Sequence, residues 1–158
     1  KTILFIFYGL MLNEFMGKQK ERSMINRKEN IAIHNVINAF EKMDMGLFEY
    51  IAEDVDLAID HYKDDADTKW QQCQSKQEMA GLLGRLAQDV FPKGTHVLAL
   101  SSQALGDGWY ITTFSQQFWY GILSKEVIGK SLIVSHELDG QVDYFRETVQ
   151  AVEILEPA

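Results

Sequence analysis

The closing hairpin of the chain carries a side chain that could do acid–base chemistry near neutral pH. The stretch "SLIVSHELDGQVDYFRETV", residues 131–149, predicts two strands joined by a tight turn, and His136 interrupts an apolar alternation within it. One strand face holds Leu132, Val134, His136 and Leu138, and the other holds Ser131, Ile133, Ser135 and Glu137. The first face is the more apolar, so we expect it to point inward. Because an unpaired buried imidazole is costly, His136 would either face a polar cavity as an acid, base or ligand donor, or be a core histidine satisfied by a backbone or hydroxyl group.

Polar and aromatic side chains elsewhere could complete a ligand pocket around this histidine. Gln116 and Gln117 are adjacent in "FSQQFWY", so one of them faces inward, where a ligand carbonyl or hydroxyl could satisfy its amide. Four aromatic residues with polar tips could wall the cleft: Trp70, Tyr110, Trp119 and Tyr120. The alternative is that these aromatic residues belong to the core or to a dimer interface.

Acidic residues outnumber basic ones, which restricts the partners that we expect. The formal net charge is -8 over 158 residues, whereas binding to nucleic acid or to an anionic membrane relies on Lys and Arg. We therefore expect a small-molecule ligand and neither nucleic acid nor membrane as a partner. The single cysteine, Cys73, cannot form an internal disulfide, so we expect a cytoplasmic protein.

The histidines show no pattern that would hold a metal ion. They stand at His34, His61, His96 and His136, without the short spacings typical of zinc ligands. We expect no metal and no cofactor.

The first 25 residues form a segment distinct from the rest of the chain. "KTILFIFYGLML" is an apolar run that is too short to span a membrane. It could be the core of a signal peptide, which would make the protein secreted, although no small-x-small cleavage site follows it. It could also be an extra element packed on a partner subunit. We expect residues 26–158 to form one domain.

The pattern along this domain predicts segregated helices and strands. Helices are expected near residues 33–40, 47–54 and 75–91, the last opened by a Ser75–Glu78 capping box. A half-buried strand is expected at residues 55–61, followed by a polar loop. Four consecutive strands are then expected at residues 95–105, 109–123, 126–138 and 141–155, with "GDG" and Asp139–Gly140 as hairpin turns. This order predicts an α+β fold with an antiparallel sheet.

The order of elements resembles a known superfamily. The first helix, "MDMGLFEYIAEDVDL", the capped helix and a final "DGQVDYFRETV" hairpin are similar to the nuclear-transport-factor-two-like superfamily, and within it to the SnoaL-like polyketide cyclases. The resemblance covers residues 26–155. It implies three helices packed in a strongly curved mixed or antiparallel sheet, a cone with a pocket at its open end. It also implies a homodimer that forms through the outer face of the sheet.

The resemblance also implies candidate catalytic residues. Ketosteroid-isomerase relatives use an aspartate near the end of the first strand as a base, which corresponds here to Asp60 or His61; alternation favours His61 on the apolar side, and a one-residue bulge would favour Asp60. Glu147 matches an acidic position that is catalytic in epoxide-hydrolase relatives, and would face inward with Phe145 and Val149. Its carboxyl would then have a raised pKa. The alternatives are a solvated strand end for Asp60 and His61, and pairing with Arg146 or a lysine for Glu147.

Neither of these catalytic sets is complete in this chain. The isomerase tyrosine would fall near residues 36–38 and its second acid near residues 132–135, and neither is present; the Arg-x-Asp pair of the epoxide hydrolases would fall in the uncharged "TTFSQQF". We therefore expect a small-molecule-binding protein, with cofactor-independent acid–base catalysis of the cyclase, isomerase or dehydratase type as one reading. The other reading is a non-catalytic dimerisation or ligand-sensing module.

Overall fold

This computed structural model describes residues 30–60 and 71–156 of the chain. The apolar leader, residues 1–25, lies outside the described residues, and so do His61 and Trp70. The elements are α2 (Ala32–Glu41), the 3-10 helix η1 (Met45–Tyr50), β1 (Ile51–Ile59), β2 (Gln71–Cys73), α3 (Lys76–Asp89), β3 (Thr95–Gly106), β4 (Trp109–Tyr120), β5 (Lys125–Leu138) and β6 (Gln141–Ile154).

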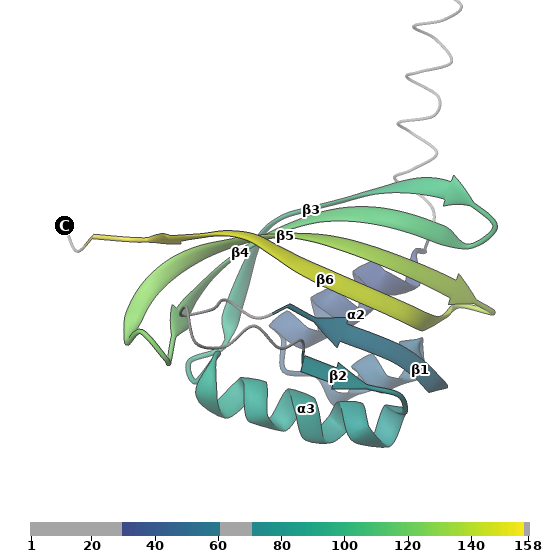
Figure 1. The fold of residues 1–158 in the computed structure, drawn as a ribbon, viewed down its shortest axis with the longest axis horizontal. Coiled ribbons are helices and arrows are strands. Elements are labelled where there is room, and N and C mark those ends of the chain that lie inside the picture. Colours follow the sequence, from purple (N-terminus) through teal and green to yellow (C-terminus); the bar gives the residue numbers. More distant parts are fainter. Residues whose placement is uncertain (1–29, 61–70, 157–158) are drawn as a thin grey trace, which may run out of the picture. The chain divides into compact units, whose positions relative to one another are not determined.

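The strands form one mixed sheet in the order β2-β1-β6-β5-β4-β3 (Figure 1). Strands β3 to β6 follow one another as antiparallel hairpins, as predicted. Strand β1 instead pairs parallel to β6, which places the beginning of the domain beside its end. The predicted α+β class is confirmed.

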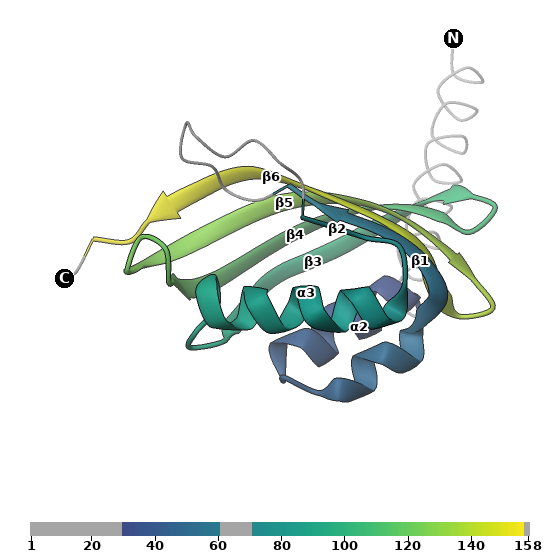
Figure 2. The same cartoon turned by 60° about the horizontal axis from the view of Figure 1, so that its bottom comes forward.

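The long strands bend, and the helices lie on the concave side of the sheet (Figure 2). Register shifts interrupt the β3–β4 ladder after Val97 and after Ala104, and the β5–β6 ladder after Lys130 and after His136. An extra residue on one strand of a pair bends that strand and increases its twist. These irregularities therefore help to curve the sheet around the helices.

Two hairpin turns follow directly from their sequence. Asp107–Gly108 and Asp139–Gly140 each place two consecutive residues in the left-handed region, with φ of 49° and 79° in the first turn and 52° and 78° in the second. Two-residue hairpin loops of this type need positive φ at both central positions, which Asp-Gly supplies at low cost. Both predicted turns are confirmed.

Helix α3 begins at its predicted cap. The Ser75 hydroxyl accepts a hydrogen bond from the Glu78 amide at 3.2 Å, and the Glu78 carboxylate accepts one from the Gln74 amide at 2.9 Å. Helix α2 is capped differently, because its N-cap, Ile31, has no polar side chain. A carboxylate from the sheet replaces it: Glu137 accepts a hydrogen bond from the Ala32 amide at 2.7 Å.

Two local predictions are wrong. The helix predicted at residues 47–54 extends only to Tyr50, as part of the 3-10 helix η1. Strand β1 starts at Ile51, which pairs with Val142 of β6. Residues 71–73 lie in the predicted loop but form β2 against β1. In both places pairing with a distant strand overrides local propensity.

The core fills the space between the helices and the concave face of the sheet. Its fully buried aliphatic residues are Ile33, Ile51, Val55, Leu82, Val127, Ile133 and Val142. Within the described ranges, no helix is long and apolar enough to cross a membrane.

Candidate functional site

A cavity of about 120 Å³ lies between the concave face of the sheet and the helices. Its walls are mostly apolar and come from α2, η1, β1, α3, β4, β5 and β6, with Leu57, Leu83, Phe114, Ile133 and Phe145 among them. A volume of this order is enough for a small organic molecule, because a dry engineered cavity of about 150 Å³ binds benzene.

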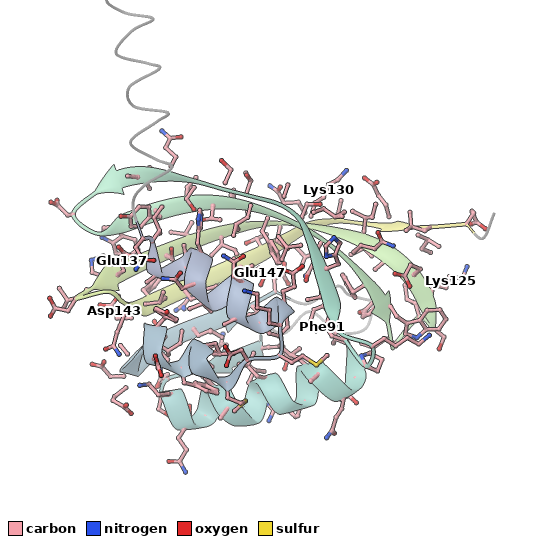
Figure 3. All side chains as sticks on the ribbon, turned by 180° about the vertical axis from the view of Figure 1, so that it is seen from behind. Phe91, Lys125, Lys130, Glu137, Asp143 and Glu147 are labelled. Carbon is pink, nitrogen blue, oxygen red and sulfur yellow. The ribbon has the colours of Figure 1, made fainter. Side chains whose placement is uncertain are left out.

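One carboxyl group, that of Glu147, stands among these apolar walls. Glu147 lies in the middle of β6 opposite Ile133 of β5, and Figure 3 shows it on the helix side of the sheet. The side chain is half-buried and lines the cavity. Burial raises the pKa of the Glu147 carboxyl, and a hydrogen bond with Ser131 partly offsets that increase. The inward orientation predicted for Glu147, Phe145 and Val149 is confirmed, whereas the catalytic role of Glu147 stays a prediction.

The arginine next to Glu147 in sequence does not neutralise it. Arg146 points to the opposite face of β6, where its guanidinium lies 2.7 Å from the Asp56 carboxylate and over the Tyr144 ring. Lys130 likewise lies on the outer side and pairs with Glu153 (Figure 3). Among the described residues, the polar partner of the Glu147 side chain is Ser131. The alternative in which Glu147 pairs with Arg146 is therefore wrong.

Asp60 joins the same cavity from the end of β1. Its backbone amide donates to the Glu147 carbonyl oxygen at 2.9 Å, so the two acidic residues stand side by side in the sheet. Of the two orientations considered for Asp60, the inward one is observed, because β1 ends at Ile59 and regular alternation stops there.

Gln116 is the inward member of the predicted glutamine pair. It is 6% exposed, lines the cavity, and accepts a hydrogen bond on its amide oxygen from the Thr95 hydroxyl at 2.7 Å. Gln117 faces the other side, where its amide nitrogen lies 3.2 Å from the Glu126 carboxylate.

The only cysteine is not a nucleophile candidate. Cys73 is a buried free thiol on β2, and burial raises its pKa, which disfavours the reactive thiolate. No cluster of three or more His, Cys, Asp or Glu side chains suited to a metal ion occurs in residues 30–60 and 71–156.

Comparison with known proteins gives no match to a family model and none to a curated protein, but it gives many matches to solved structures. A phenazine biosynthesis-related protein from Pseudomonas aeruginosa has a TM-score of 0.64 at 13% identity, over 83% of this chain and 84% of that one. A putative polyketide cyclase from Xanthomonas campestris has a TM-score of 0.58 at 15% identity, over 73% and 85%. An NTF2-like protein from Anabaena variabilis has a TM-score of 0.58 at 9% identity, over 76% and 87%. The chain has the nuclear-transport-factor-two-like fold.

In this nuclear-transport-factor-two-like cone, the face of β5 that turns to the helices and the cavity is the opposite of the one predicted. Residues Ser131 and Ile133 line the cavity, whereas His136 lies on the outer face, where its imidazole is 2.6 Å from the Asp143 carboxylate and 3.0 Å from the Asp107 carbonyl oxygen. The inward orientation predicted for His136 is therefore wrong. Alternation identifies two faces but not which one is inner. Here the inner face is the more polar one, with Ser131 at the cavity and Glu137 at the N-terminus of α2.

The predicted aromatic cleft is divided between the two faces of the nuclear-transport-factor-two-like sheet. Tyr120 and Phe145 line the cavity. Trp119 does not: it lies on the outer face with the Lys93 ammonium 3.5 Å from its ring centroid. Tyr110 lies inward but at the other end of the sheet, near Glu137.

Sequence reasoning missed two residues of the candidate site, Ser131 and Thr95. Ser131 contacts Glu147 and Thr95 orients Gln116. For Ser131 a signal existed, since Gly129, Ser131 and Ser135 alternate along one strand face and small residues there leave room for a cavity. No comparable sequence signal identifies Thr95.

Proposed function

We propose that the chain binds a small, largely apolar molecule in this cavity and that Glu147 acts on it as a general acid–base group without a cofactor. The observation that carries the proposal is the Glu147 carboxyl, which faces an apolar cavity with Ser131 as its described polar partner. A structural carboxyl group is normally paired or solvated, because burying it alone is costly.

The chemistry follows from the environment of this carboxyl. A raised pKa brings the acid and carboxylate forms of Glu147 closer to equal population at neutral pH than in an ordinary glutamate. The carboxylate can take a proton from one ligand atom, and the resulting acid can return it to another. Solved structures of this fold include a putative polyketide cyclase and a phenazine biosynthesis-related protein, which fits a role in small-molecule chemistry.

A second candidate is a non-catalytic ligand-sensing or dimerisation module. It is favoured by the composition of the described cavity wall, which contains no Lys, Arg or His that could act together with Glu147 in acid–base catalysis. Acid–base enzymes commonly use two groups whose pKa values are pushed apart.

Native mass spectrometry of the purified protein tests the binding proposal and identifies the ligand. We expect a bound small organic molecule. The variant Val149→Trp fills the cavity and should displace this molecule, whereas Glu153→Trp, on the exposed side of β6, should leave it bound. With that molecule in hand, Glu147→Gln separates the two candidates. An enzyme loses about 100-fold or more in turnover while retaining the ligand, and a module converts nothing in either form.

We also propose that two copies associate through the outer face of the sheet. That face carries exposed apolar side chains on β3 and β4, with Leu98 46%, Leu105 56% and Trp109 37% exposed. Half-buried apolar residues continue it across β4 and β5, including Ile111, Leu132 and Val134. A continuous apolar surface of this kind is typical of a protein–protein interface.

A further inference from the structure

We propose that the cavity selects uncharged ligands that carry a hydrogen-bond acceptor, such as a ketone or an amide, and rejects carboxylates of the same size. The inference rests on the proposed binding function and names the ligand class. It is drawn from the charges and the hydrogen-bonding groups that line the cavity.

The charges argue against an anionic ligand. The titratable side chains among the described lining residues are Asp60, Tyr120 and Glu147, and the described wall contains no Lys, Arg or His. The nearest cation in sequence, Arg146, is held on the other face by Asp56. An anion entering this cavity would lose its hydration, and none of the described lining residues would offer it a counterion.

The polar groups of the wall favour an acceptor on the ligand. Gln116 on β4, Ser131 on β5 and Glu147 on β6 lie on the concave sides of three adjacent strands. Gln116 lines the cavity, and its amide oxygen is engaged by the Thr95 hydroxyl, so its amide nitrogen is the group that remains to donate to a ligand. None of the described residues accepts a hydrogen bond from that nitrogen.

Glu147 adds a second donor to this row. Burial favours the protonated form of its carboxyl, and that form carries an O–H. A ligand carbonyl near Gln116 and Glu147 would therefore meet two donors. A hydrocarbon of the same shape would leave both of them unsatisfied, which costs free energy in a closed apolar site.

Three aromatic probes of similar size test the inference on the full chain: acetophenone, ethylbenzene and benzoate. Protein-observed NMR titration at neutral pH measures each dissociation constant. We expect acetophenone to bind about five- to tenfold more tightly than ethylbenzene, which corresponds to one net hydrogen bond. We expect benzoate to bind less tightly than acetophenone, because the described wall offers its carboxylate no cation.

The variant Gln116→Met tests whether the Gln116 amide nitrogen causes the preference for acetophenone over ethylbenzene. Methionine keeps the length of the side chain but has no N–H. The ratio of the dissociation constants of ethylbenzene and acetophenone should therefore fall at least halfway toward one. The matched control is Gln117→Met, on the outer face, which should leave the ratio unchanged. Binding of ethylbenzene to each variant reports that the cavity is still formed.

Each outcome bears on a separate claim. Equal binding of acetophenone and ethylbenzene, or an unchanged ratio in Gln116→Met, overturns the acceptor preference and leaves the binding function standing. Benzoate binding as tightly as acetophenone overturns the rejection of carboxylates. If none of the three probes binds, the proposed binding function itself fails.

Discussion

At the scale of single residues, Glu147 is the side chain whose surroundings depart most from those of an ordinary surface residue. Its position in the middle of β6 puts the carboxyl among apolar side chains, and the hydrogen bond from Ser131 compensates only part of the lost hydration. The fold therefore retains a destabilising group at this position. Retaining such a group is typical of functional sites.

The raised pKa of Glu147 predicts how stability changes with pH. The folded state holds the Glu147 proton more tightly than the unfolded state does, so this group favours folding below the ordinary glutamate pKa. That contribution is lost as the pH rises from the ordinary glutamate pKa through the raised pKa of Glu147 in the folded state. In Glu147→Gln the group cannot ionise, so wild type should lose stability relative to the variant over this range, by at most about 1.4 kcal/mol per pH unit.

Urea unfolding of both proteins between acid and neutral pH measures this difference. The matched control is Glu153→Gln, on the same strand but exposed and paired with Lys130. A difference between wild type and Glu147→Gln that does not vary with pH would contradict the prediction.

At the scale of elements, the ends of the two helices are set by different means. The N-terminus of α3 is capped locally by Ser75, whereas that of α2 depends on Glu137, a residue more than a hundred positions away in the sequence. Glu137 also lies near His34 and Tyr110 and ties α2 to the sheet. Helix α2 therefore needs the sheet to complete its first turn.

The local cap of α3 gives a prediction at this scale. Ser75→Ala removes the hydroxyl that accepts from the Glu78 amide, and should lower the free energy of unfolding by about 1 kcal/mol. Gln77→Ala, an exposed position in the same first turn, should change it by less than about 0.5 kcal/mol. Chemical denaturation measures both values, and equal losses would show that the hydroxyl is not the stabilising group.

At the scale of the whole molecule, the two faces of the sheet have different roles. The concave face holds the cavity, and the outer face carries the apolar and aromatic residues that we assign to a second copy of the chain. This division explains why His136 and Trp119 are absent from the cavity. They lie on the face that the proposed dimer would cover.

The proposed dimer predicts the effect of a charge on the outer face. Leu132→Glu places an unpaired carboxylate in the proposed interface and should raise the dimer dissociation constant about tenfold or more. Ile122→Glu introduces the same charge in the exposed connection between β4 and β5, away from that face. It should leave the dimer dissociation constant unaltered. Light scattering coupled to size-exclusion chromatography reports the mass of each species. A wild-type chain that remains monomeric at high concentration would exclude the dimer.

Local sequence patterns determined much of the fold. The four long strands, their Asp-Gly turns and the Ser75 cap depend on neighbouring residues and on short-range periodicity, and all of them were predictable. The inward position of Glu147 was also predictable, through the resemblance of the closing hairpin to a known fold.

Only the tertiary structure decided which face of each strand became the inside. Alternation divides β5 into two faces, but the choice between them depends on where the helices pack, and the helices cover the face of Ser131 rather than that of His136. The β1–β6 pairing, the strand β2 and the Thr95–Gln116 contact also join residues far apart in the sequence. Such contacts form only when the chain closes on itself, and for that reason local patterns do not contain them.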